Sequence, residues 1–211
     1  FGRSSAAEKD AQRFDQQKAG VSDAITKLRG HIKILSERLI ELDPDGSAEV
    51  VQHTHELTSL PSLKQFEIDI DDMAKSDDHP FTVAFVDIDN FKSINSRIGH
   101  GKADDVIKHL AAFLVEATFE RAKVYHRSGD EFLLILENTT SKEAQLFLTR
   151  VIAEVKAENF PHLGKTISIS IGTASFPEHS KDPATLKEQS NKAMLKAKEK
   201  KGSVVIFPSK P

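Results

Sequence analysis

The chain has 211 residues, a formal net charge of −3 and 38% hydrophobic residues, values that are ordinary for a soluble globular protein. A net charge this small, without a long basic run, argues against a nucleic-acid partner, and the absence of cysteine excludes disulfides and thiolate metal sites. No apolar run approaches the ~18 residues of a membrane span, so we expect no direct membrane contact from this chain. Because it begins at Phe1-Gly2 rather than at Met, we expect it to be a fragment of a longer protein.

A heptad pattern runs through residues 1–42, which contain no proline. Its members recur every seven residues, with a second row interleaved at four-three spacing: Phe14, Val21, Leu28, Leu35 and Leu42, with Ile25, Ile32 and Leu39. The pattern predicts a signalling or dimerisation helix, assigned to residues 1–46, that forms a parallel coiled coil. The alternative is one amphipathic helix of a bundle, because three heptads hardly separate a period of 3.5 from one of 3.6. We expect the helix to end at Pro44, because proline cannot continue it.

Strand and helix patterns alternate through the rest of the chain, residues 47–211. Apolar runs predict strands at 81–89, 123–127, 132–137, 165–176 and 203–207, and helical periods predict helices at 103–119, 141–155 and 183–200. Since a tight turn joins two of the strands, the sheet must be antiparallel in part. The pattern predicts an α/β (α+β) fold, with a palm-like or ferredoxin-like mixed sheet flanked by helices.

Two adjacent carboxylates, Asp130 and Glu131, follow Ser128-Gly129 at the start of an apolar strand. Gly129 suits a tight hairpin turn because glycine tolerates a positive φ. Neighbouring residues of a strand point to opposite faces. We therefore expect Asp130 to face a site, where a divalent cation would compensate its charge, and Glu131 to point elsewhere.

A second acidic pair, Asp87 and Asp89, ends the strand predicted at 81–89. Residues two apart share a face of a strand, and the carbonyl of Ile88 adds another hard oxygen. Oxygen ligands of this kind fit Mg²⁺, which binds few carboxylates and completes its shell with water and substrate phosphate. The alternative is that these carboxylates cap strand ends in solvent.

The following segment, "NFKSINSRIGHGKADD", offers groups for a nucleotide. Lys92 is placed to meet phosphate as a point charge. Asn95 supplies a donor and an acceptor, and Asp104 a carboxylate, which together match the edge of guanine. The alternative is that these residues only form turns and helix caps.

Six segments in this order resemble the GGDEF domain of diguanylate cyclases: "LTSLP", "VDIDNFKSIN", "IGHGKADD", "SGDEF", "SISIGTA" and "AMLKAK". The resemblance covers roughly residues 54–207, with SGDEF as a variant of the signature, and we assign the catalytic domain to residues 47–211. It implies a palm-like fold and the condensation of two GTP into cyclic di-GMP with loss of two pyrophosphates. Each half-site of the family holds one GTP, so the resemblance also implies a homodimer. The N-terminal heptads would then bring the two copies together.

The resemblance assigns roles to individual residues. It implies that Asp87, Asp130 and the carbonyl of Ile88 bind Mg²⁺, with Mn²⁺ as the alternative. Asp130 would also take the proton from the ribose 3′-hydroxyl, and Lys92 would stabilise the transition state on the phosphate side. Glu131 is the second acid of the signature.

The substrate-binding residues implied by the resemblance are Asn95 and Asp104, which read guanine, His100, which contacts the substrate, and Lys198, which reaches the triphosphate. The partners implied are GTP and a second copy of the chain, under the control of an upstream sensory domain. The expected location is the bacterial cytoplasm, as part of a larger membrane-anchored or soluble sensor protein.

Several positions depart from the family pattern. Ser128 replaces the first glycine of the signature, and the phosphate-binding arginine near the C-terminus is missing, with Lys200 or Lys201 as substitutes. The inhibitory R-x-x-D sequence is absent, with Phe119 and Ala122 at its key positions, so we expect no product inhibition there. These departures keep a second hypothesis open, a catalytically degenerate GGDEF domain that acts as a GTP-binding or protein-interaction module. A structural domain with no role toward nucleotides is a third.

Overall fold

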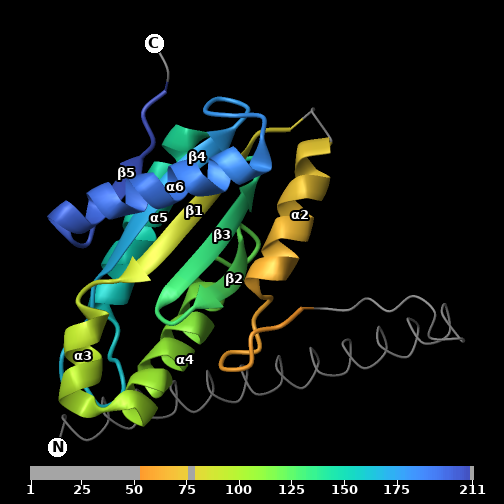
Figure 1. Cartoon of the computed structure of the whole chain (residues 1–211). Coiled ribbons are helices and arrows are strands. Elements are labelled where there is room, and N and C mark those ends of the chain that lie inside the picture. The colour runs from red at the N-terminus through yellow and green to blue at the C-terminus, as the bar shows by residue number, and fades with distance from the viewer. Residues whose placement is uncertain (1–52, 76–78, 210–211) are drawn as a thin grey trace, which may run out of the picture. The chain divides into compact units, whose positions relative to one another are not determined.

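A five-stranded mixed sheet forms the centre of the computed structural model, which describes residues 53–75 and 79–209. The strand order is β2-β3-β1-β4-β5 (Figure 1). The strands are β1 (Phe81–Ile88), β2 (Lys123–Ser128), β3 (Glu131–Glu137), β4 (Ile169–Phe176) and β5 (Val204–Ile206). Neighbouring strands are antiparallel except β4 and β5, which are parallel. The predicted heptad helix and its boundary at residue 46 lie outside the described residues, and both stay predictions.

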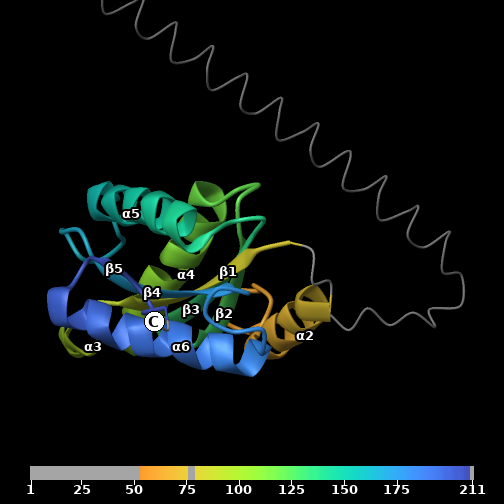
Figure 2. The same cartoon turned by 90° about the horizontal axis from the view of Figure 1, so that it is seen from above.

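Helices cover both faces of the sheet. They are α2 (Leu63–Lys75), α3 (Phe91–Ile98), α4 (His100–Ala117), α5 (Ser141–Ala157) and α6 (Pro183–Ala197), which continues into the 3-10 turn η1 (Lys198–Lys200). Figure 2 shows α4 and α5 on one face, and α2 and α6 on the other. This arrangement confirms the predicted fold class. Among the described residues, no helix combines the length and the apolar character needed to span a membrane.

The central strand β1 is buried along its whole length. Val86 and Ile88 belong to the core beneath α4 and α5, whereas Val83 and Phe85 belong to the core beneath α2 and α6. A strand covered on both faces has a nearly continuous apolar sequence, as this one does. Asp87 continues the second set, so its side chain emerges on the face that α6 covers.

Helix α6 packs unusually closely on β4 at Gly172. A Cβ atom there would lie 1.9 Å from the backbone nitrogen of Met194 and 2.3 Å from the backbone oxygen of Ser190. Only glycine leaves room for this approach. The close contact sets the height of α6 above the sheet, and with it the position of Lys198 just beyond the end of the helix.

The structure also contains two helices that the sequence patterns did not predict, α2 and α3. Helix α3 occupies part of the segment interpreted as a loop before a helix at 103–119, and α4 begins at His100 instead. The start of α3 lacks a side-chain cap, because Asn90 adopts a left-handed conformation with φ of 58°. Gly99, with φ of 83°, separates α3 from α4. Start signals do exist in the sequence: Ser62 and Gln65 have the spacing of a capping box at the start of α2, and Asn90 precedes α3. Asn90 does not act as a side-chain cap in the structure.

Candidate active site

The β2–β3 turn carries the signature to the end of the sheet where β1 stops and α3 begins (Figure 1). Ser128 pairs with Glu131, which leaves Gly129 and Asp130 at the centre of the turn. Gly129 has φ of 56°, a region that residues with a Cβ atom disfavour. Ser128 does not have a positive φ. Serine in place of the first signature glycine therefore causes no backbone strain.

Three charged side chains meet at this end of the sheet. Asp87 is only 7% exposed and forms an ion pair with Lys198, which follows α6. Asp130 lies close enough to Asp87 for each carboxylate to affect the pKa of the other. The structure thus joins residues from β1, the β2–β3 turn and the end of α6, which are separated by 43 to 111 positions in the sequence.

The surroundings of Asp87 and Asp130 disfavour their ionised forms. Burial raises the pKa of Asp87 to about 6 against the opposing effect of Lys198, and the charges of Asp130 and Glu131 add to the rise. Burial also raises the pKa of Asp130, opposed by a backbone hydrogen bond and by the charge of Lys198. Carboxylates in this situation are stabilised by a nearby cation. The site therefore favours positive charge beyond what Lys198 supplies.

Glu131 is held apart from this group. It lies opposite Asp87 in the β1–β3 register, but its carboxylate forms an ion pair with Arg127 and accepts a hydrogen bond from Ser128 Oγ at 3.3 Å. The predicted alternation of Asp130 and Glu131 along a strand is wrong, because β3 begins at Glu131 and Asp130 lies in the turn. The ion pair with Arg127 is what draws the Glu131 carboxylate aside.

Asp89 serves a structural purpose. Its carboxylate accepts hydrogen bonds from Ser168 Oγ at 2.5 Å, Ser170 Oγ at 2.6 Å and the Gly202 backbone N–H at 2.9 Å. These bonds tie the end of β1 to β4 and to the segment before β5. Because Ser170 is the β4 partner of Asp87, the Asp89 carboxylate lies on the same face as Asp87, as predicted, but these hydrogen bonds occupy it.

The predicted guanine-reading residues gather around the junction of α3 and α4. Asn95 Nδ2 and His100 Nδ1 are 3.0 Å apart, across the turn that Gly99 makes. Asp104 lies four residues after His100 on α4, so both are on the same side of that helix. Among the described residues, Asn95 Oδ1 is a buried oxygen without a hydrogen-bond partner. Asn95 Oδ1 is thus an acceptor that no described residue of the chain satisfies.

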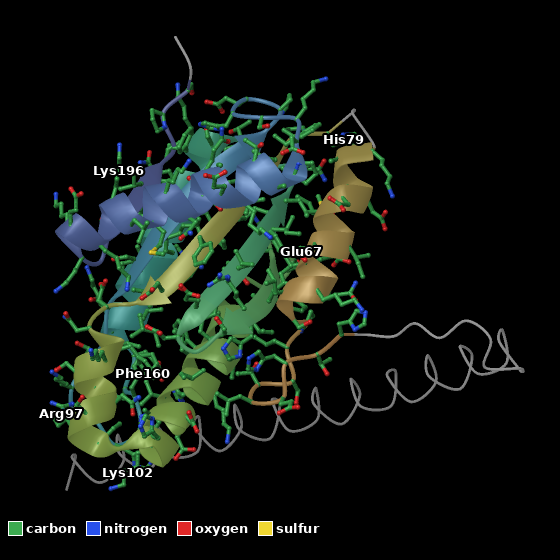
Figure 3. The ribbon with its side chains drawn as sticks, in the orientation of Figure 1. Glu67, His79, Arg97, Lys102, Phe160 and Lys196 are labelled. Carbon is green, nitrogen blue, oxygen red and sulfur yellow. The ribbon has the colours of Figure 1, made fainter. Side chains whose placement is uncertain are left out.

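Basic side chains surround the same end of the molecule. Lys92 is exposed on the first turn of α3. Lys201 donates a hydrogen bond to Asn90 Oδ1 at 2.8 Å, which places it beside the β1–α3 loop. Figure 3 places Arg97 on α3 and Lys102 near the start of α4 in the same region. Lys201 is thus the better candidate to replace the missing arginine.

The oxygen atoms at the end of β1 and in the β2–β3 turn are possible ligands for a metal ion. In the described part of the chain, no group of three or more His, Cys, Asp or Glu residues forms a ready cation site. Asp87 and Asp130 supply two carboxylates, and the carbonyl of Ile88 lies where β1 ends. Mg²⁺ commonly binds through one or two carboxylates and takes its other ligands from water and substrate phosphates. The raised pKa values of both carboxylates fit such a site.

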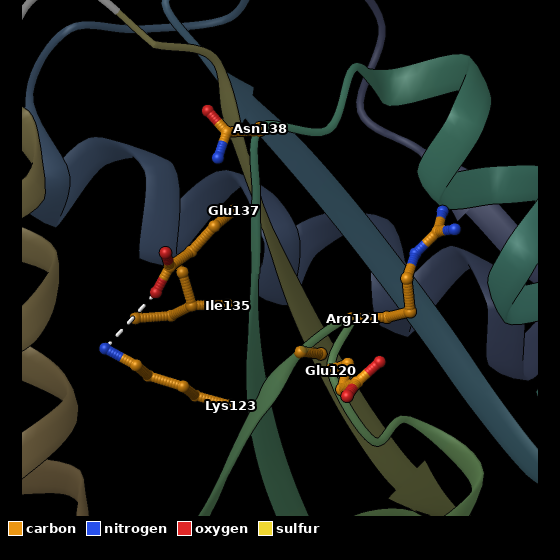
Figure 4. A pocket seen from close by; sticks show the side chains of 7 residues that line it. Glu120, Arg121, Lys123, Ile135, Glu137 and Asn138 are labelled. Carbon is orange, nitrogen blue, oxygen red and sulfur yellow. Dashed lines mark ion pairs between the residues drawn. The ribbon is translucent and has the colours of Figure 1, made fainter.

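A cavity of about 410 Å³ lies at the opposite end of β3 (Figure 4). Its lining residues are Glu120, Arg121, Ala122, Lys123, Ile135, Glu137 and Asn138. Lys123 and Glu137 form an ion pair across it, with N···O at 3.2 Å. Glu137 pairs with Phe81 at the start of β1, the end of that strand far from Asp87. The cavity is therefore separate from the candidate active site.

Sequence reasoning missed two residues next to the turn. Arg127 pairs with Glu131, and this pair of opposite charges on adjoining strands could have been noticed. His126 is fully buried and its Nε2 lies 2.9 Å from the carbonyl oxygen of Gly129. The signal available in the sequence was a histidine directly after Val124 and Tyr125 in a predicted strand.

Comparisons with known proteins point to one family. The family model described as "Diguanylate cyclase, GGDEF domain" matches residues 52–203. Diguanylate cyclase TpbB of Pseudomonas aeruginosa is 33% identical over 162 residues, which are 74% of this chain and 37% of that protein. Cyclic di-GMP phosphodiesterase PdeR of Escherichia coli is 25% identical over 161 residues, 75% of this chain and 24% of that protein. The chain thus spans 24–37% of the length of these two curated relatives.

A solved structure agrees with these matches. The GGDEF domain of TpbB from Pseudomonas aeruginosa superimposes with a TM-score of 0.68 and 30% sequence identity. The superposition covers 74% of this chain and 95% of that one. The likeness in structure therefore involves nearly the whole of the other domain.

Proposed function

Since the chain belongs to the GGDEF family of diguanylate cyclases, we propose that it condenses two GTP molecules into cyclic di-GMP and two pyrophosphates. The convergence of Asp87, Asp130 and Lys198 at the end of β1 is the observation that carries this proposal. Buried carboxylates that need a cation, beside a lysine, are suited to a metal-bound triphosphate.

Different residues of the site have different roles in one condensation step. Asp87, Asp130 and the carbonyl of Ile88 would hold Mg²⁺ or Mn²⁺, which supplies positive charge at the phosphates. Asp130 accepts the proton of the ribose 3′-hydroxyl, and its raised pKa makes it a stronger base than an ordinary carboxylate. The 3′-oxygen bonds to the α-phosphorus of the other GTP, and the bond from that phosphorus to the leaving pyrophosphate breaks. Lys92 and Lys198 balance the charge on the phosphate oxygens.

The α3–α4 junction is the proposed guanine pocket. Asp104 accepts hydrogen bonds from N1–H and the exocyclic amine, and Asn95 Oδ1 accepts another. His100 holds the Asn95 amide in the orientation that leaves this oxygen free. Adenine has no N1–H and presents its amine elsewhere, so the arrangement selects GTP over ATP.

The reaction needs two such half-sites facing each other, because each holds a single GTP. We propose that the active form is a homodimer, assembled through residues 1–46 and controlled by an upstream sensory domain. The two condensation steps are then equivalent, each closing one phosphodiester of the cyclic product.

A second candidate function is a catalytically degenerate domain that binds GTP or a partner protein and regulates another activity. The similarity to PdeR, which is a phosphodiesterase by name, favours it. The replacement of the C-terminal arginine by lysine favours it too, because lysine cannot make the paired contacts of a guanidinium group.

One assay separates the two functions. The protein is incubated with GTP and Mg²⁺ at high protein concentration, and cyclic di-GMP is measured together with GTP binding. The cyclase should yield cyclic di-GMP, whereas GTP binding without any product supports the regulatory module.

The matched control is Asp130→Asn, which keeps the size of the side chain but cannot accept the proton. It should abolish turnover while the circular dichroism spectrum stays unchanged. Full activity in Asp130→Asn would show that another group is the base.

A further inference from the structure

The loop of residues 53–62, which leads into the described domain, folds tightly on itself. Ser62 N–H donates to the carbonyl of His53 at 2.6 Å, and His55 N–H donates to the carbonyl of Leu60 at 2.8 Å. Ser59, with φ of 59°, makes the tight turn at its tip. We call this segment the 53–62 loop.

The 53–62 loop attaches to the free edge of β2 at His126. The backbone N–H of His126 donates to the carbonyl of Pro61 at 2.9 Å, and Ser62 forms a parallel bridge with the same residue. Because β2 is the outermost strand, this loop takes the place of a neighbouring strand at that point.

The His126 side chain connects the loop to the signature turn. It is fully buried, and both ring nitrogens have partners: Thr58 Oγ1 lies 2.9 Å from Nδ1, and the carbonyl oxygen of Gly129 lies 2.9 Å from Nε2. A carbonyl oxygen only accepts, so Nε2 carries the proton and Nδ1 accepts the hydroxyl proton of Thr58. The neutral imidazole thus spans the space between the loop and the turn.

Two aromatic contacts fix the plane of this imidazole. The His55 ring stacks on one side, with ring centroids 3.7 Å apart, and the Phe132 ring stacks with centroids 4.7 Å apart. His55 is itself held, because its Nδ1 accepts the Leu57 N–H at 3.2 Å. The orientation of His126 is therefore determined by residues of the loop as well as of the sheet.

We propose that His126 is a positioning residue, which fixes the Gly129–Asp130 peptide and thereby aims the Asp130 carboxylate at Asp87. Gly129 has no side chain to restrain it, so the direction of its carbonyl group depends on the hydrogen bond from His126. That carbonyl belongs to the planar Gly129–Asp130 peptide, which includes the nitrogen and Cα of Asp130. Fixing the carbonyl therefore fixes the position of these two Asp130 atoms. The inference rests on the proposed cyclase function and adds the 53–62 loop to its machinery.

Two substitutions at one position test this role. Glutamine places its amide nitrogen near the position of Nε2 and still reaches Gly129, whereas asparagine places it near Nδ1 and reaches only Thr58. Both lose the ring stacking, so that loss cancels in the comparison. We expect His126→Asn to lower kcat by about 10- to 100-fold with little change in KM for GTP, and His126→Gln to retain most of it.

Loss of stability alone is controlled with Val151→Ala in α5, a buried substitution far from the turn. Equal kcat values for the asparagine and glutamine variants would overturn the proposal. So would a loss in His126→Asn no larger than that in Val151→Ala at the same folded fraction.

Amide hydrogen exchange of residues 129–131 in the GTP-free protein tests the positioning without relying on turnover. Loss of one hydrogen bond should speed exchange there by about tenfold in His126→Asn, and much less in His126→Gln. Exchange that is equal in His126→Asn and the wild type would refute the positioning role. If the wild type makes no cyclic di-GMP, the cyclase proposal fails, and this exchange experiment still decides the role of His126.

Discussion

At the residue scale, Lys198 is the basic side chain bound directly to the buried Asp87 carboxylate. Removing it leaves that carboxylate without its ion-pair partner and removes a charge that the proposed triphosphate would meet. We expect Lys198→Ala to lower kcat/KM for GTP by about 10- to 100-fold, the value of a hydrogen bond to a charged group. Steady-state kinetics of product formation measure the change.

Lys196 is the matched control for this substitution. It lies on α6, exposed to solvent and two residues before Lys198 (Figure 3). Lys196→Ala removes the same charge two residues away, at the end of α6, and should leave kcat/KM within about twofold, because exposed charges contribute little. A similar loss in both variants would point to a long-range charge effect instead of the contact with Asp87.

His126 makes the stability of the domain depend on pH. Burial, with a smaller contribution from the charge of His55, lowers its pKa below the ordinary value of 6.5, although the bond to Gly129 opposes the shift. The unfolded chain therefore binds more protons than the folded one as the pH falls below 6.5. The contribution of neutral His126 is present in full above pH 6.5 and decreases below it, by up to about 1.4 kcal/mol per pH unit.

Urea unfolding of wild type and His126→Gln at pH 7.5 and pH 5.5 isolates this effect. The free energy of unfolding of the wild type should fall more on acidification than that of the variant. The comparison is needed because Asp87, whose pKa is raised to about 6, acts with the opposite sign and stabilises the fold as the pH falls. An identical pH dependence for both proteins would contradict the prediction.

At the element scale, the contact between α6 and β4 is the most sensitive to added volume. A methyl group at Gly172 would strike backbone atoms of Met194 and Ser190, which cannot rotate away. Gly172→Ala should therefore lower the free energy of unfolding by about 3 kcal/mol, at the upper end for overpacking. It should also displace Lys198 from Asp87. Urea denaturation and the rate of cyclic di-GMP formation measure the two effects.

Gly101→Ala is the control for this prediction. Gly101 lies in α4, and a Cβ atom there would meet nothing within 4 Å. Alanine in a helix is favoured over glycine by about 0.5–1 kcal/mol, so this variant should be slightly more stable than the wild type. If Gly172→Ala behaved in the same way, the packing of α6 would be looser than described.

The elements differ in how far the sequence predicts them. Strand β1 follows directly from its apolar run, because both of its faces are buried. Helix α3 does not, since it has only eight residues and begins at a left-handed Asn90 without a side-chain cap. Asp130 illustrates a third situation: a shift of one residue in the start of β3 moves it from strand to turn. The ion pair of Lys198 with Asp87 depends on tertiary packing, which no local pattern encodes.

At the scale of the whole molecule, the proposed homodimer predicts a dependence on concentration. Deleting residues 1–46 should lower specific activity most at low protein concentration, because association of two copies then becomes limiting. Cyclic di-GMP formation measured over a dilution series of both proteins checks this. A specific activity that does not change on dilution of the shortened protein would remove the proposed role of the heptads.

The 53–62 loop has a consequence for how two copies can meet. An uncovered outer strand offers its backbone groups to a strand of another chain, and sheets often join in this way. Here Pro61 already accepts the N–H of His126 on the outer side of β2. A second copy that extended the sheet from β2 would have to displace the loop, and in doing so would release Thr58 from the His126 ring. Joining of two sheets at this edge is therefore incompatible with a fixed signature turn.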